Sequence, residues 1–156
     1  MEKISPHVSY REATKSITAR RKGISNHPNS KKLMNMQRIA RDVFEPLREA
    51  LGGRPIGIAS FYRSVPLNKA IGGSANSQHC DGEAMDIDAD IYDLHTNKEI
   101  FDWIKDNARF DQLIFEFGSP QEPEWVHVSQ VKEGNRGEIL VAFKKDGRTH
   151  YKYYNG

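Results

Sequence analysis

The sequence predicts a small α+β protein with a mostly antiparallel sheet flanked by helices. Apolar residues recur every three to four positions in one long segment and alternate with polar residues in several short ones. These patterns follow one another without a regular β-α-β order, which argues against a doubly wound parallel sheet. The 156 residues, 37% of them apolar, suffice for one core and exclude a second large domain. We therefore treat residues 1–156 as a single domain.

The N-terminal part of the sequence predicts a polar arm followed by a long helix. Residues 1–28 contain few apolar side chains and are expected to wrap around the domain. From Asn29 or Ser30, apolar residues recur at helical spacing until Gly52-Gly53 end the pattern. Pro46 lies inside this segment and removes one backbone hydrogen bond, which predicts a kink or two abutting helices.

The rest of the chain is dominated by strand patterns. Strands are expected at 56–61, 85–90, 112–117 and 125–131, helices at 66–71 and 96–107, and a terminal hairpin of 139–144 and 150–154 within residues 133–156. Asp86, Asp88 and Asp90 alternate with apolar residues, so in a strand their carboxylates would project from one face. That face cannot be ordinary core.

Charge and hydropathy exclude several classes of partner. Residues 1–50 carry 11 Lys or Arg against 5 Asp or Glu, but the basic clusters are short and lack interleaved aromatic residues. A solvated face therefore explains them better than nucleic-acid binding. No apolar stretch approaches the roughly 20 residues that span a bilayer. We expect no nucleic-acid and no membrane partner, and a monomer.

Three residues stand out as potential metal ligands. Cys80 is the only cysteine, so a metal site must use histidines and carboxylates. Glycine-rich backbone brackets His79, Asp86 begins the run of alternating carboxylates, and His127 lies beside Trp125 on a later strand. Their shared context, rather than any one residue alone, indicates a site.

A calcium loop is the competing interpretation of the alternating aspartates. Ile91 stands where such a loop requires glycine, and Asn97 stands where it requires a bidentate glutamate. We therefore reject an EF-hand, and we expect Asp88 and Asp90 to orient the ligand histidines or to face solvent.

Two short motifs carry a family resemblance. Residues 77–86 read Ser-Gln-His-Cys-Asp-Gly-Glu-Ala-Met-Asp, and residues 124–127 read Glu-Trp-Val-His. They resemble the Ser-x-His-x-x-Gly-x-Ala-x-Asp and Glu-x-x-His halves of the signature of the zinc D-alanyl-D-alanine carboxypeptidase family of metallopeptidases. The similarity extends through 60–64, 67–73 and 111–117 and ends near Glu133. The expected fold is that of the D-Ala-D-Ala peptidases and of the hedgehog signalling domain.

The resemblance implies a zinc site made by His79, Asp86 and His127. Two imidazoles and one carboxylate leave the fourth zinc position free, as in catalytic sites. Another divalent ion is also compatible with these ligands.

The resemblance also implies roles for residues that are not ligands. Glu124 would be the general base, and Arg63 would contact the substrate and stabilise developing negative charge. Ser77 would lie near the terminal carboxylate of the substrate.

The position of Glu124 raises a geometric problem. Residues 124 and 127 differ by an odd number, so on an ideal strand their side chains face opposite ways. Pro123 makes a turn before Trp125 reasonable, which would take Glu124 off the strand. If Glu124 instead faces solvent away from the metal, Glu116 replaces it as the candidate base.

The function implied by the resemblance is zinc-dependent hydrolysis of peptidoglycan stem peptides at a bond involving a D-amino acid. The enzyme would be a D,D-carboxypeptidase or an endopeptidase. The alternative is a non-catalytic zinc-containing module that binds cell wall or builds a virion. The first fifteen residues lack the apolar run of a secretory signal. The chain would thus be cytoplasmic when made, and a phage endolysin released through a holin pore, or a phage particle component, is one hypothesis.

Overall fold

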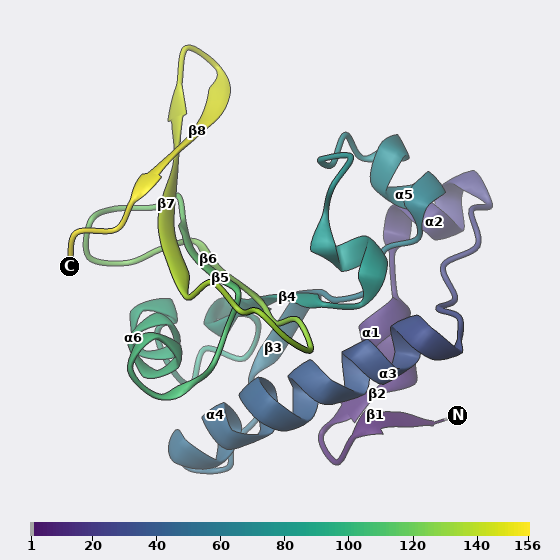
Figure 1. Cartoon of the computed structure of the whole chain (residues 1–156), viewed down its shortest axis with the longest axis horizontal. Helices are drawn as coiled ribbons and strands as arrows, with labels where there is room; N and C mark the ends of the chain where they lie inside the picture. Colours follow the sequence, from purple (N-terminus) through teal and green to yellow (C-terminus); the bar gives the residue numbers. More distant parts are fainter. Residues whose placement is uncertain (1) are drawn as a thin grey trace.

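A computed structural model describes residues 2–156, and a six-stranded sheet forms its centre. The strand order is β3-β4-β6-β5-β7-β8, and only the β5–β7 pair is parallel (Figure 1). The strands are β3 (Gly57–Ser60), β4 (Ala84–Asp88), β5 (Gln112–Glu116), β6 (Trp125–Ser129), β7 (Glu138–Lys145) and β8 (Arg148–Tyr153). The predicted α+β class with a mostly antiparallel sheet is confirmed.

The predicted long helix consists of three abutting segments, α3 (Ser30–Ile39), the π-helical η1 (Ala40–Phe44) and α4 (Glu45–Ala50). The Asn29 side chain caps the start of α3 by accepting a hydrogen bond from the backbone of Lys32. Pro46 occupies the first turn of α4, directly after η1. The Glu45 backbone N–H, directly before Pro46, donates to the Ala40 carbonyl oxygen, which is the i to i−5 bond of a π turn.

The expected N-terminal arm is built into the fold. It contains β1 (Lys3–Ser5), β2 (Val8–Ser9), α1 (Tyr10–Thr14) and α2 (Ile17–Lys22). Ile4, Val8 and Ala13 are buried in the common core. The Asn26 side chain donates hydrogen bonds to the carbonyl oxygens of Thr14 and Tyr62, which attaches the arm to the segment after β3.

Shorter helices connect the strands: α5 (Val65–Ala70), the 3-10 turns η2 (Gln78–Asp81) and η3 (Ala89–Ile91), and α6 (Asn97–Asn107). Strand β4 ends at Asp88, whose side chain accepts hydrogen bonds from the backbone of Asp90 and from the Asn97 side chain. Asp90 therefore lies in η3 and not in the strand. The prediction that Asp86, Asp88 and Asp90 project from one face of a strand is wrong for Asp90. Within residues 2–156, no helix is both long and apolar enough to cross a membrane.

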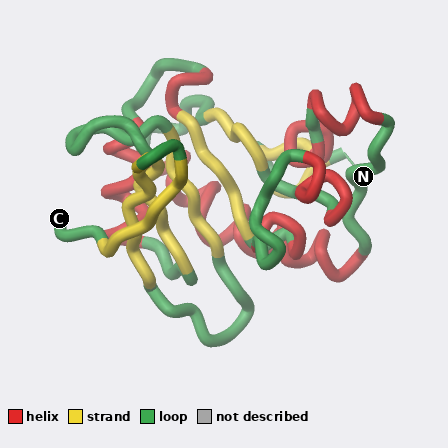
Figure 2. Tube along the Cα trace, turned by 90° about the horizontal axis from the view of Figure 1, so that it is seen from above, coloured by secondary structure: helices red, strands yellow, loops and turns green. Residues whose placement is uncertain are grey.

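The two faces of the sheet differ in chemistry. The face toward the helices is apolar and joins the core through Met85, Ile87, Leu113, Phe115, Val126 and Val128. Helical segments flank the strands, with the two chain ends on opposite sides of the molecule (Figure 2). The intervening residues of the same strands, Asp86, Glu116 and His127 among them, line a cleft on the other face. Strand alternation thus separates the core from the candidate site.

Gly82 controls how η2 packs against α3. It ends η2 with a φ of +73°, and a Cβ atom there would lie 2.5 Å from the Lys32 carbonyl oxygen and 2.8 Å from Met36 Cγ. Only glycine satisfies both the left-handed conformation and the close approach. This contact positions the turn that carries His79.

We expect Gly82→Ala to destabilise the protein more than Gly72→Ala. Both glycines have positive φ, but a Cβ at Gly72 meets nothing within 4 Å, so only Gly82→Ala adds a clash with α3. The added cost should be about 1–3 kcal/mol in the free energy of unfolding. Urea denaturation of both variants measures the difference, and equal stabilities would contradict the packing role.

Candidate metal centre

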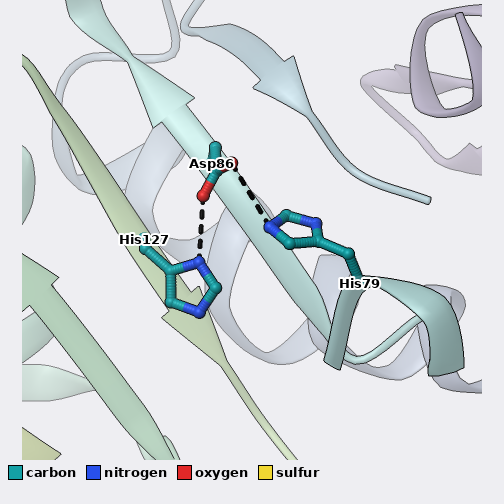
Figure 3. A group of neighbouring side chains, drawn as sticks. All are labelled: His79, Asp86 and His127. Atoms are coloured by element: carbon teal, nitrogen blue, oxygen red, sulfur yellow. Dashed lines mark hydrogen bonds and ion pairs between the residues drawn. The ribbon is translucent and has the colours of Figure 1, made fainter. Parts of the chain in front are cut away.

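His79, Asp86 and His127 come from η2, β4 and β6 and meet on the cleft face of the sheet (Figure 3). One ligand atom from each lies within 4.8 Å of the others. The sheet register pairs Asp86 directly with His127, and Asp86 Oδ1 lies 2.9 Å from His127 Nδ1. Asp86 Oδ2 lies 3.3 Å from His79 Nε2. The structure therefore brings together the three residues that the sequence analysis selected as ligands.

The surroundings of His79 orient its ring for metal binding. Nδ1 lies 2.6 Å from the carbonyl oxygen of Phe61, so this nitrogen carries the proton and donates it. Nε2 is then left with a lone pair, and it is buried without a hydrogen-bond partner among residues 2–156. A buried polar atom of this kind is costly unless something binds it. Two imidazoles and one carboxylate are the donors that Zn²⁺ accepts, so these residues fit the metal.

Asp86 is held in its ionised form. Burial alone would raise its pKa, but the neighbouring His79 and His127 outweigh burial and keep the pKa of Asp86 well below its usual range. The carboxylate is therefore available as an anionic ligand at any physiological pH.

The three side chains line a cleft of about 790 Å³ that also contains Arg63 and Ser77. The Arg63 backbone N–H donates to the carbonyl oxygen of His79. This hydrogen bond fixes the arginine beside η2, which we call the ligand turn because it carries His79. The Nε atom of Arg63 is buried without a hydrogen-bond partner among the described residues. The Ser77 hydroxyl accepts a hydrogen bond from the His79 backbone N–H. Both residues thus lie next to the candidate metal centre.

The two candidate bases lie in different places. Glu116 is buried and lines the cleft of the three ligands, whereas Glu124 is exposed and lines a separate cavity beside Phe117 and Lys144. Strand β6 is regular from Trp125 onward, and Trp125 pairs with Glu116 on the face that also carries His127. The odd spacing between Glu124 and His127 therefore keeps Glu124 away from the cleft. Glu116 is therefore the glutamate of the two that shares a cleft with the three candidate ligands.

Glu116 also has an unusual environment for a carboxyl group. Burial raises the pKa of Glu116 to about 7, with nearby His127 opposing the rise and Asp86 adding to it. A carboxyl that gains and loses a proton near neutral pH suits proton transfer.

A family model described as Peptidase M15 matches residues 6–129. The chain belongs to the peptidase M15 family. The family resemblance found in the sequence is thereby confirmed. A similar curated protein is the zinc D-Ala-D-Ala carboxypeptidase of Streptomyces albus G, which is 40% identical over 45 residues. That match covers 29% of this chain and 18% of the relative, so it spans less than a fifth of the relative's length.

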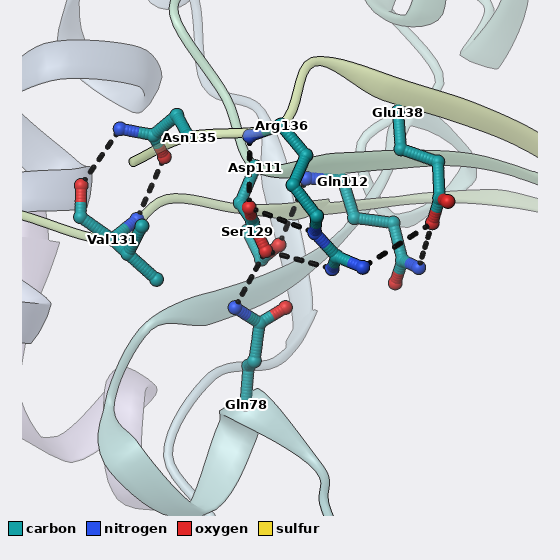
Figure 4. A network of polar contacts seen from close by, with 8 residues as sticks. All are labelled: Gln78, Asp111, Gln112, Ser129, Val131, Asn135, Arg136 and Glu138. Carbon is teal, nitrogen blue, oxygen red and sulfur yellow. Dashed lines mark hydrogen bonds and ion pairs between the residues drawn. The ribbon is translucent and has the colours of Figure 1, made fainter. Parts of the chain in front are cut away.

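A polar network in this member of the M15 family ties the turn that carries His79 to the start of β7 (Figure 4). The Asp111 carboxylate accepts a hydrogen bond of 3.0 Å from the Gln78 side chain, directly before His79. It also accepts three hydrogen bonds from Arg136, two from the guanidinium and one from the backbone. The Arg136 guanidinium holds the pKa of Asp111 below its usual range. The sequence analysis missed this role of Asp111, because its partners are 25 and 33 residues away in the chain.

We expect Asp111→Asn to lower the free energy of unfolding by about 1–3 kcal/mol at pH 7, since it removes charge-assisted hydrogen bonds from a buried carboxylate. The pKa of Asp111 is lower in the folded protein than in the unfolded chain, where an aspartate has a pKa of about 3.9. Its ionised form therefore stabilises the folded protein above that pH, and the stabilisation is lost as the pH falls through the folded pKa. The difference in the free energy of unfolding between wild type and variant should therefore decrease below about pH 4. Urea unfolding across pH 7 to 3.5 measures it.

The matched control is Asp106→Asn, which removes an exposed carboxylate paired with Lys105. It should change stability by less than about 0.5 kcal/mol. A gap for Asp111→Asn that does not change with pH would contradict the electrostatic explanation.

Proposed function

We propose that this M15 peptidase uses zinc to hydrolyse peptidoglycan stem peptides at a bond involving a D-amino acid. The observation that carries the proposal is the convergence of two imidazoles and an ionised carboxylate in a cleft that also holds Arg63 and Glu116. Membership of a peptidase family supports hydrolysis of a peptide bond. The name of the Streptomyces albus G relative supports zinc and the D-amino acid substrate.

In this proposal His79, Asp86 and His127 hold the zinc ion. His79 contributes Nε2, because its Nδ1–H is engaged by the carbonyl of Phe61. Zinc bound by three protein ligands supplies a Lewis acid that polarises a carbonyl and acidifies water. The hydrogen bond from His79 to Phe61 and the Asp111–Gln78 contact keep the ligand turn in place.

Glu116 acts as the general base in place of Glu124. Its carboxylate accepts a proton from the water that attacks the scissile carbonyl and then returns it to the leaving amine nitrogen. Support comes from its place in the cleft, from its cross-strand position beside Trp125, and from a pKa raised by burial to about 7. Glu124 is exposed and lines the separate cavity instead.

Arg63 and Ser77 bind the substrate. The guanidinium of Arg63 carries a fixed positive charge, and its buried Nε–H has no hydrogen-bond partner in the described part of the chain. It stabilises the negative charge that develops on the carbonyl oxygen during attack. Ser77, on the same wall, contacts the terminal carboxylate of a substrate.

Exchanging each glutamate for glutamine separates the two candidate bases. We expect Glu116→Gln to retain zinc and lose at least about 100-fold in kcat, because general-base catalysis typically contributes 10²–10⁴-fold. Glu124→Gln should stay within about twofold of wild type, since its side chain points into another cavity. Zinc content by elemental analysis accompanies the kinetics. If Glu124→Gln loses activity and Glu116→Gln does not, Glu124 is the general base.

The bond that is cut is found by mass spectrometry of fragments released from isolated peptidoglycan by the zinc-loaded protein. Loss of one D-alanine identifies a D,D-carboxypeptidase, and free stem peptides or split cross-links identify an endopeptidase. We expect a chelator to abolish either product and added zinc to restore it. No metal-dependent product on several wall types would favour the non-catalytic module instead. The endolysin hypothesis and the monomeric state stay predictions.

A further inference from the structure

The metal cleft has two walls, and they come from distant parts of the chain. One wall is the ligand turn with Arg63 and residues 72–78, and the other is the β7–β8 hairpin, through Leu140, Thr149 and Tyr151. Figure 1 shows this hairpin and the α5–η2 segment rising on the same side of the sheet, at opposite edges. The hairpin lies beyond residues 6–129, which the family model matches. This wall is therefore supplied by a part of the chain that the family match does not include.

The sheet register places Tyr151 in one row with Glu116. Trp125 pairs with Glu116, Glu116 pairs with Ala142 on β7, and Ala142 pairs with Tyr151 on β8. Neighbours in such a row point to the same face, so Tyr151 and Glu116 face the cleft together. The residue between them in the row is the small, buried Ala142, whose side chain ends at Cβ.

The electrostatics of Tyr151 agree with this placement. Burial, the Glu116 carboxylate and the Asp86 carboxylate all raise the pKa of the Tyr151 phenol, so the hydroxyl keeps its proton at neutral pH. The residue is still 55% exposed. A protonated phenol and an accessible ring on a cleft wall are suited to bind a peptide, the hydroxyl by hydrogen bonding to a carbonyl and the ring by packing.

The residues that line the cleft follow one another in a fixed order across the strands of the sheet. Arg63 and the turn that carries His79 lie on the β4 side of the cleft. Strand β6 with His127 comes next, then β5 with Glu116, and Tyr151 on β8 lies at the far edge. A peptide that crosses the strands with its scissile bond between the metal ligands and Glu116 would extend toward Arg63 on one side and toward Tyr151 on the other.

We propose that Tyr151 is a substrate-binding residue and that the β7–β8 hairpin selects the part of the stem peptide on the side of the scissile bond away from Arg63. This inference rests on the proposed function. The hydroxyl donates a hydrogen bond to a peptide carbonyl, and the ring packs against the neighbouring residue of the substrate. The hairpin thereby extends the cleft beyond the reacting bond.

The test measures binding separately from turnover. Glu116→Gln, loaded with zinc, is titrated by calorimetry with a synthetic stem peptide that contains the L-Ala–D-Glu bond and a D-Ala–D-Ala end. The same titration is made with Tyr151→Phe and Tyr151→Ala added, and kcat and KM are measured for each change in the active protein. We expect Tyr151→Ala to weaken binding and raise KM at least tenfold, and Tyr151→Phe three- to tenfold, with kcat changed less and zinc content unchanged.

Lys152→Ala is the matched control, because Lys152 is the exposed neighbour of Tyr151 on the same strand, pairs with Val141 on the opposite face and lines the separate cavity. It should stay within twofold of wild type in both measurements. Wild-type binding and KM in the Tyr151 variants would overturn the hairpin proposal while the proposed function stands. If the Glu116→Gln protein does not bind the peptide and the wild type does not cleave it, the proposed function fails and the hairpin proposal fails with it.

Discussion

The register between β4, β6 and β5 is the constraint on which the other features of the protein depend. It places Asp86 opposite His127 and Glu116 opposite Trp125, all on one face of the sheet. A slip by one residue would turn every side chain to the other face and put the site carboxylates into the core. Burying an apolar side chain contributes about 1.5–3 kcal/mol, and six such residues on the opposite face hold the register. The hydrophobic core thus determines the geometry of the polar site behind it.

Two of the three proposed ligands come from the sheet, and the third depends on contacts outside it. Asp86 and His127 are positioned by strand pairing, whereas His79 comes from a 3-10 turn. That turn is held by the carbonyl of Phe61, by Asp111 through Gln78, and by the close packing of Gly82 on α3. The Phe61 contact restrains the ring and the other two restrain the turn before any metal binds, which lowers the cost of organising the site.

The cleft combines a part that the family match covers with a part that it does not. The proposed ligands, Arg63 and Glu116 all lie within residues 6–129, so the groups proposed for the chemistry belong to the matched region. The wall that carries Tyr151 comes from β8, which joins the sheet through the parallel β5–β7 pair. Such a division is physically reasonable, because a hairpin at the edge of a sheet can change without disturbing the register at its centre.

The amino-acid sequence by itself determined the α+β class, the positions of most strands and helices, and the candidate ligand set. Hydrophobic periodicity is local, so the segments around Ile87, Ile104 and Val128 could be assigned from their neighbours alone. The motif around His79 and Asp86 and the residue pair Trp125-His127 were likewise visible as short patterns. The sequence also indicated that Glu124 and His127 would face opposite ways on an ideal strand, because the alternation of side chains along a strand is a local property.

Only the tertiary structure decided which glutamate shares the cleft with the ligands and which residues form its second wall. Glu116 lies next to Trp125 because two strands pair, and Tyr151 faces the same cleft because two further strands add to that row. Asp111 reaches Gln78 and Arg136 across long stretches of chain. Contacts of this kind depend on strand order and register, which are set by the packing of the whole core and leave no mark in the local pattern.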